Sequence, residues 1–181
     1  TGGAGHGKTR LGAEVVTKHG GIYETASPVH SFETGWFLQR VLEVVLATAR
    51  KKTGVEETAS GVQVDPTEEE FFLGLNTDNI QRFIAGDWSG LDKVKLAEEL
   101  RTLLNNIAKE SDKGKTVLFL DNLEACDEFS AQILSVLLSE KWEAMKNVQF
   151  LLGGRTGTGE EIPGPLVPFF RESLEVKPLT L

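Results

Sequence analysis

Residues 1–10 read TGGAGHGKTR, and this stretch decides the expected fold. It matches the whole Gly-x-x-x-x-Gly-Lys-Thr pattern of a phosphate-binding loop, at Gly2, Gly7, Lys8 and Thr9. Glycines let backbone N–H groups approach phosphate oxygens closely, and the positive end of the following helix adds to the anion site. The pattern therefore predicts a loop that binds nucleotide phosphates and runs directly into a helix.

Two side chains of this loop carry separate parts of the chemistry. Lys8 is expected to reach the β- and γ-phosphates as a point charge, and the Thr9 hydroxyl to complete a Mg²⁺ shell. A glycine-rich loop that only caps a helix is the alternative. The residues predicted to contact the nucleotide are Gly2, Gly3, Ala4, Gly5, His6, Gly7, Lys8, Thr9 and Arg10. His6 occupies a variable position of the pattern and receives no catalytic role.

The composition sets limits on partners and compartment. The formal net charge of −8 argues against broad binding to nucleic acid or to an anionic membrane. A single cysteine, Cys126, excludes an intrachain disulfide, and no apolar run approaches the ~18 residues of a membrane span. No signal-peptide pattern opens the chain, so a cytoplasmic protein is expected. The chain begins at Thr1, without the Met and the strand that we expect ahead of such a loop. We therefore expect it to be cropped from a longer protein.

Hydrophobic periodicity predicts alternating helices and strands. Helical patterns run over 8–19, 32–52, 92–110 and 129–145, with shorter ones over 68–75, 77–86 and 165–173. Strand-like runs occur around 21–27, 116–121, 148–154 and 174–181, and a polar, acidic stretch over about 53–66 is expected to be a mobile insertion. This alternation is typical of a parallel sheet with helices on both faces, so residues 1–181 are expected to form one α/β domain.

A second motif follows the most apolar strand, TVLFLD at residues 116–121. A buried strand that ends in Asp121 places a carboxylate at the carboxyl edge of the sheet, near the phosphate-binding loop. An acid at that position holds Mg²⁺, usually through water. Thr9 and Asp121 are therefore the predicted metal-binding pair.

A hydrolytic site also needs a group that orients the attacking water. The residue after Asp121 is Asn122, which cannot act as a base. Glu124 is a candidate, and it is weighed about evenly against a purely structural role. Asp127 and Glu128 are nearby, but they are better explained as acids that favour the start of the next helix.

A third motif, VQFLLGGRTGTG at residues 148–159, places Arg155 just beyond the next strand. A cation at this edge could stabilise a γ-phosphate, although a solvent-facing arginine in a glycine-rich loop is the alternative. The catalytic candidates are thus Glu124 and Arg155. The three tryptophans are expected to pack rather than to stack on bases, at Trp36, Trp88 and Trp142.

In this order and spacing, GGAGHGKTRL, VLFLDNLEACDEFSAQIL, VQFLLGGR and LEVKPLTL resemble STAND-type ATPases, the signal-transduction relatives of the AAA+ class. The resemblance implies a three-layer P-loop NTPase sandwich, with the N-terminal strand and the C-terminal helical lid lying outside this chain. It implies phosphate and Mg²⁺ binding by Gly7, Lys8 and Thr9, a Walker B acid at Asp121 and a sensor arginine at Arg155. The chain departs from the family at Asn122, where the family carries an acid.

The leading hypothesis is a module that binds ATP and hydrolyses it slowly with Mg²⁺, as a conformational switch in a larger signalling or regulatory protein. The resemblance implies other domains of the same chain as partners, and oligomerisation that depends on the nucleotide. A scaffold that binds ATP without hydrolysis is the alternative, which Asn122 favours. A P-loop kinase ranks lower, because residues 55–90 are acidic. Replication-initiator ATPases share the pattern, but their DNA-binding domain would lie outside this chain.

Overall fold

The protein is seen in a computed structural model that describes residues 7–53, 78–109, 111, 113–139, 145, 147–155 and 161–170, except for the side chains of 49–53. Its sheet has three strands: β1 (Gly21–Thr25), β2 (Thr116–Asp121) and β3 (Val148–Leu152). Their order is β1-β2-β3, and both pairings are parallel. The predicted parallel α/β arrangement is therefore confirmed for the described residues, with the β2 strand at its centre.

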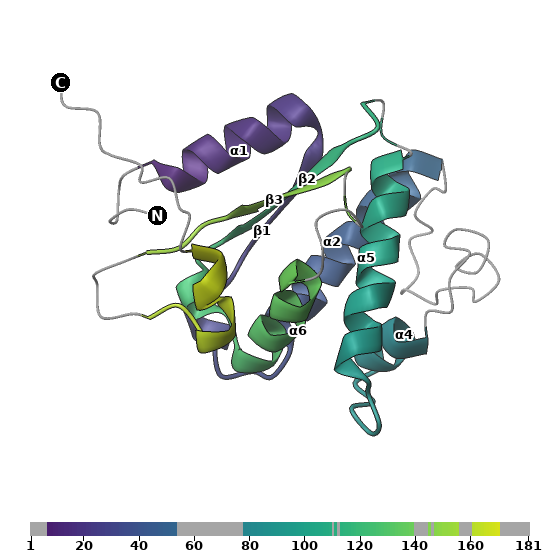
Figure 1. Ribbon diagram of the computed structural model, residues 1–181, viewed down its shortest axis with the longest axis vertical. Coiled ribbons are helices and arrows are strands. Elements are labelled where there is room, and N and C mark those ends of the chain that lie inside the picture. Colours follow the sequence, from purple (N-terminus) through teal and green to yellow (C-terminus); the bar gives the residue numbers. More distant parts are fainter. Residues whose placement is uncertain are drawn as a thin grey trace.

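Helices cover both faces of this sheet (Figure 1). The described helices are α1 (Lys8–His19), α2 (Trp36–Thr53), α4 (Asp78–Ile84), α5 (Lys93–Lys109) and α6 (Glu128–Ser139), with 3-10 turns η1 (Pro28–His30), η2 (Leu123–Ala125) and η4 (Gly164–Phe170). Of the described helices, α1 lies on one face, while α2, α5 and α6 lie on the other (Figure 1). The bounds of α1 and β2 agree with the sequence prediction.

The α1 helix approaches the sheet closely because of one glycine. Gly12 is the buried residue of this helix, and a Cβ atom there would overlap the ring of Phe119 on β2. The Phe119 ring also stacks on Tyr23 of β1, with 5.1 Å between ring centroids. The close contact fixes the height of α1 above the carboxyl half of the sheet.

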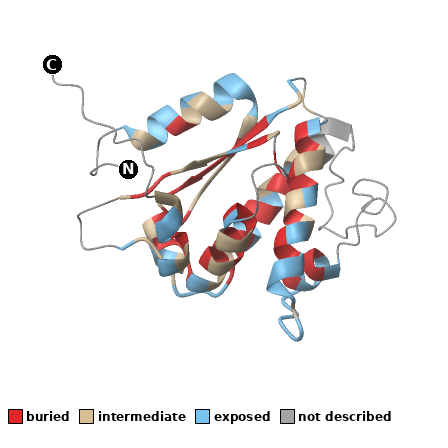
Figure 2. Ribbon diagram, in the orientation of Figure 1, coloured by how far each residue is buried: buried red, intermediate tan, exposed pale blue. Residues whose placement is uncertain are grey.

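The main core lies on the opposite face (Figure 2). The α5 helix contributes five large apolar residues to it, all of them buried: Leu96, Leu100, Leu103, Leu104 and Ile107. Val94 of the same helix is also apolar, but it is 49% exposed. Two residues before Leu96 correspond to about 200° around a helix, so Val94 faces away from the core.

Long-range capping explains why α2 begins at Trp36 rather than at the predicted residue 32. The backbone N–H groups of Gly35 and Phe37 donate to the carboxylate of Asp127, at 2.8 and 3.2 Å. These bonds satisfy donors that a helix start would otherwise leave unpaired. Residues 31–35, between η1 and α2, form turns and a bend instead of a helical turn.

Other predictions are confirmed only in part or lie outside the described residues. The predicted helix over 129–145 is seen as α6 over Glu128–Ser139, and residues 140–144 lie outside the described part. The predicted helix over 165–173 is seen as η4 through Phe170. The predicted insertion over 53–66 begins at Thr53, the last residue of α2, and its residues 54–66 lie outside the described part. The short helix over 68–75, the strand over 174–181 and Trp142 are likewise outside it. No described helix is both long and apolar enough to cross a membrane.

Candidate functional site at the carboxyl edge of the sheet

The first two motifs meet at the carboxyl end of β2. The Thr9 hydroxyl, in the first turn of α1, donates a hydrogen bond to Oδ2 of Asp121 at 2.5 Å, across 112 positions of sequence. Asp121 ends the fully buried strand and is itself 1% exposed. The fold therefore brings together the two side chains that were predicted to hold a metal ion.

The carboxylate of Asp121 is held from two further sides. The backbone N–H of Asn122 donates to its Oδ1 at 2.9 Å. Gly153, just after β3, lies so close that a Cβ atom there would overlap the same oxygen. Burial raises the pKa of the Tyr23 phenol, and the charge of Asp121 adds to that rise. These contacts hold the carboxylate of Asp121 in place at the edge where β2 and β3 end.

The start of α1 carries the remaining described residues of the phosphate-loop motif. Gly7 precedes the helix with a φ of 79°, in the left-handed region, and its carbonyl accepts the N–H of Leu11 at 2.9 Å. Lys8 is half-buried. Arg10 is exposed, and its guanidinium pairs with Glu14 at 3.2 Å, so the structure does not bring it towards Asp121. Gly2, Gly3, Ala4, Gly5 and His6 lie outside the described residues.

The two predicted catalytic residues, Glu124 and Arg155, are brought together and bind each other. The Arg155 Nε lies 3.3 Å from Oε1 of Glu124, and the Arg155 backbone N–H donates to Oε2 at 3.1 Å. The Glu124 side chain is 3% exposed, whereas that of Arg155 is 41% exposed. Both carboxylate oxygens of Glu124 are therefore engaged, and the pair joins the segments that follow β2 and β3.

Asp127 has the structural role that was preferred for it. Its carboxylate accepts the N–H and the hydroxyl of Ser130, at 2.9 and 2.6 Å, in addition to the two N–H groups at the start of α2. The carboxylate caps two helices at once. Glu128 is exposed and accepts from Gln132 within α6, as expected for an acid in a first turn.

A polar contact that was not predicted joins β1 to β2 beside Asp121. The Asn122 side-chain amide donates to the Thr25 hydroxyl at 3.1 Å, and Thr25 is the register partner of Asp121. Asn122 has a φ of 54° and is the one non-glycine residue with positive φ in the described ranges. Thr25 is missed by sequence reasoning because only the strand register places it next to the acid.

The arrangement fits a magnesium ion. Mg²⁺ prefers oxygen ligands and is commonly held by one or two carboxylates together with substrate phosphates. Thr9 and Asp121 supply one hydroxyl and one carboxylate oxygen at a single point. Over the described ranges, no cluster of three or more His, Cys, Asp or Glu side chains is placed to hold a metal, and a site completed by phosphates needs no such cluster.

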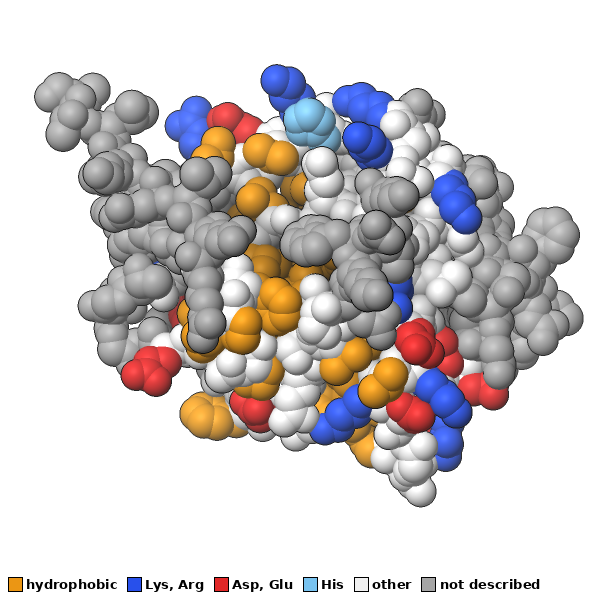
Figure 3. Space-filling model, in the orientation of Figure 1, with side chains coloured by type: hydrophobic (Ala, Val, Ile, Leu, Met, Phe, Trp, Pro, Cys, Tyr) orange, Lys and Arg blue, Asp and Glu red, His pale blue; other side chains and the backbone are white. Residues whose placement is uncertain are grey.

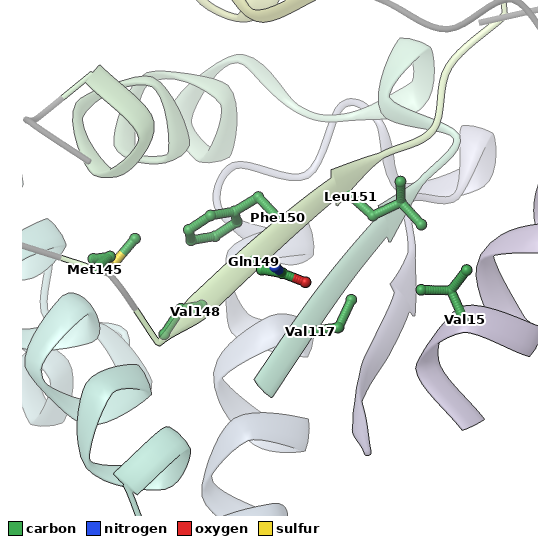
Figure 4. Close-up of a pocket in the computed structure, with 7 residues that line it drawn as sticks. All are labelled: Val15, Val117, Met145, Val148, Gln149, Phe150 and Leu151. Atoms are coloured by element: carbon green, nitrogen blue, oxygen red, sulfur yellow. The ribbon is translucent and has the colours of Figure 1, made fainter. Parts of the chain in front are cut away.

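A cavity of about 420 Å³ lies apart from this edge, between α1 and β3 (Figure 4). It is lined by Val15, Val117, Met145, Val148, Gln149, Phe150 and Leu151. Apolar side chains gather on the same face below α1 (Figure 3). Gln149 is the one polar lining residue, so the cavity lacks the converging polar groups of a phosphate site. We place the candidate site at Asp121.

Comparisons with known proteins give no name to this arrangement. No protein-family model matches the chain, and no curated protein or solved structure was found to be significantly similar to it. The resemblance to STAND-type ATPases therefore stays a prediction.

Proposed function

We propose that this chain binds ATP and hydrolyses it slowly with Mg²⁺, as a P-loop switch module of a larger signalling or regulatory protein. The observation that carries the proposal is the hydrogen bond between Thr9 and Asp121. Each residue was predicted independently, from a separate motif, to take part in one metal and phosphate site. Their meeting across the fold is what a Walker A and Walker B pair requires.

Each side chain has a defined task in the proposed site. Lys8 attracts the β- and γ-phosphates, and the start of α1 adds backbone donors to them. When bound, Mg²⁺ would neutralise charge that develops on the phosphates during transfer. Thr9 and Asp121 would hold that ion, directly or through water.

A switch also needs a route from the nucleotide to other parts of the molecule. The ion pair of Glu124 and Arg155 joins two loops at the carboxyl edge, beside Asp121. Arg155, half-exposed, would exchange its carboxylate partner for a γ-phosphate and thereby release Glu124. We propose this exchange as the local change that other domains, or further copies of the protein, would sense in the cytoplasm.

A non-hydrolysing scaffold is the second candidate. It is favoured by the same ion pair, because a glutamate whose two oxygens both accept from Arg155 is not free to serve as a base. In that case ATP would act by occupancy alone and order the module for assembly with other proteins.

Calorimetric titration of the full-length protein with ATP and Mg²⁺ tests the proposal. Lys8→Ala should weaken binding at least about 100-fold, because a charge-assisted contact to phosphate is lost. Lys18→Ala is the matched control, since it removes an exposed lysine from the last turn of the same helix and should leave affinity unchanged. Equal ATP binding by Lys8→Ala and the parent protein would exclude the phosphate site.

A further inference from the structure

The contact between Asn122 and Thr25 has no role in the site so far, although it lies directly beside Asp121. We propose that the Asn122 side-chain amide, positioned by the Thr25 hydroxyl, orients the water that attacks the γ-phosphate. This inference rests on the proposed ATPase function and names the group that would perform its hydrolytic step. It replaces Glu124 in that role.

Position is the first observation behind this assignment. Asn122 follows Asp121 immediately, and its backbone N–H donates to the Asp121 carboxylate at 2.9 Å. Its side-chain Nδ2 donates to Thr25, which pairs with Asp121 in the β1–β2 register. The amide is therefore fixed at the same edge of the sheet as the predicted metal ligands.

The hydrogen-bond pattern also defines which end of the amide is available. The Thr25 hydroxyl donates to the carbonyl of Ala26 at 3.4 Å, so it accepts from Asn122 rather than donating to it. Nδ2 is thus the atom that faces Thr25, and Oδ1 is the acceptor that faces elsewhere. In the part of the chain that the structure describes, no hydrogen bond to Oδ1 is found.

Backbone geometry is the second observation. With a φ of 54°, Asn122 lies in the left-handed region of backbone conformation. Residues other than glycine adopt this region at a cost of about 1 kcal/mol. Asparagine tolerates this region better than most residues. The conformation turns the chain sharply after β2 and aims the side chain back towards β1.

The burial of Glu124 is the third observation. Its two oxygens both accept from Arg155, and its side chain is 3% exposed. Asn122 is half-buried and lies closer along the chain to Asp121. Both oxygens of Glu124 are engaged by Arg155, whereas Oδ1 of Asn122 accepts no hydrogen bond from the described residues.

The chemistry does not require a base at this position. Phosphoryl transfer depends mainly on positioning and on charge stabilisation, and an amide side chain serves to orient water in other nucleotide hydrolases. The water oxygen forms a bond to the γ-phosphorus, and the bond from that phosphorus to the bridging oxygen breaks, with the electron pair leaving on ADP. One proton stays on the attacking oxygen, and the other moves to a phosphate oxygen. Asn122 accepts a hydrogen bond throughout and exchanges no proton.

The test compares ground-state and transition-state binding in the full-length protein. Asn122→Gly removes the amide and keeps the left-handed backbone, while Thr25→Val removes the hydroxyl and keeps the shape. We expect both variants to bind ATP with Mg²⁺ within about threefold of the parent. We also expect single-turnover cleavage to fall about 100-fold and affinity for ADP with aluminium fluoride to fall about tenfold or more.

Three further variants sharpen this result. Thr25→Ser should keep cleavage and affinity for the fluoride complex near the parent's values, because serine keeps the hydroxyl that Thr25→Val removes. Glu124→Gln, which weakens the ion pair with Arg155, should not lower affinity for the fluoride complex, because Arg155 is then released towards the γ-phosphate. Gln39→Ala, which removes an exposed amide on α2, is the control for loss of any amide.

Each result either supports or contradicts the role proposed for Asn122. The inference is wrong if Asn122→Gly matches the parent in cleavage and in affinity for the fluoride complex, or if Glu124→Gln alone abolishes them. It is also wrong if the parent binds ATP and cleaves none. A parent that binds no ATP would instead overturn the proposed function itself.

Discussion

Two buried aspartates lie six positions apart in the sequence, and their hydrogen bonds give them different roles. Asp121 is 1% exposed and Asp127 is 3% exposed. Asp127 accepts hydrogen bonds from four donors of α2 and α6, and it holds those two helices together. Asp121 accepts from its neighbour's N–H and from the hydroxyl of Thr9, at an edge where strands end.

The difference teaches that burial and charge alone do not identify a functional acid. A carboxylate whose oxygens are fully used as hydrogen-bond acceptors by nearby helices stabilises the fold. A carboxylate held next to a hydroxyl at the mouth of a predicted phosphate site keeps oxygens that a metal ion can use. The identity of the donors is what separates the two residues.

Replacing each acid by alanine gives the largest expected effect. Asp127→Ala leaves four buried donors without a charged acceptor and should lower the free energy of unfolding by about 3 kcal/mol. Asp121→Ala loses two hydrogen bonds, one of them to the exposed Thr9, and should lower the free energy of unfolding by about 1 kcal/mol or less. Urea denaturation of both variants measures the contrast.

Equal losses of stability in the two variants would remove the distinction. Ser130→Ala checks the origin of the larger loss, because it deletes one donor to Asp127 and one acceptor for the N–H of Leu38. An intermediate loss of about 1–2 kcal/mol is expected for it.

A smaller loss of stability is expected when a neighbouring side chain is enlarged against Asp121 and the aspartate itself is kept. In Gly153→Ala the new Cβ overlaps the Asp121 carboxylate, so overpacking should cost about 1–2 kcal/mol and weaken binding of ATP with Mg²⁺. Gly164→Ala is the matched control, since a Cβ there meets no atom within 4 Å. If Gly153→Ala is as stable as the control and binds equally, the carboxylate is less firmly fixed than its contacts indicate.

The helix and the strand that carry the site can be predicted from local sequence, whereas the contacts between distant residues cannot. The phosphate-loop pattern and the apolar run of β2 predict α1 and the position of Asp121, because helix starts and buried strands have local signals. The start of α2 is missed because its caps come from Asp127, about 90 residues later. Thr25 is missed for the same reason, since its neighbour Asp121 is reached only through strand register.

Glu124 and Arg155 show a different limit. Each was predicted at the carboxyl edge, and the structure places both there. Their pairing depends on how the loops after β2 and β3 approach each other, which residue patterns do not encode. The pairing makes Glu124, a candidate base from the sequence, a buried partner of a cation.

The most direct test of the central claim is the magnesium dependence of ATP affinity, measured by calorimetry in the full-length protein and in Asp121→Asn. The site built from Thr9 and Asp121 predicts that Mg²⁺ strengthens ATP binding to the parent at least about tenfold, and that this gain is lost in the variant. ATP binding to the parent that is the same with Mg²⁺ and with a chelator, or a gain that persists in Asp121→Asn, would contradict the account.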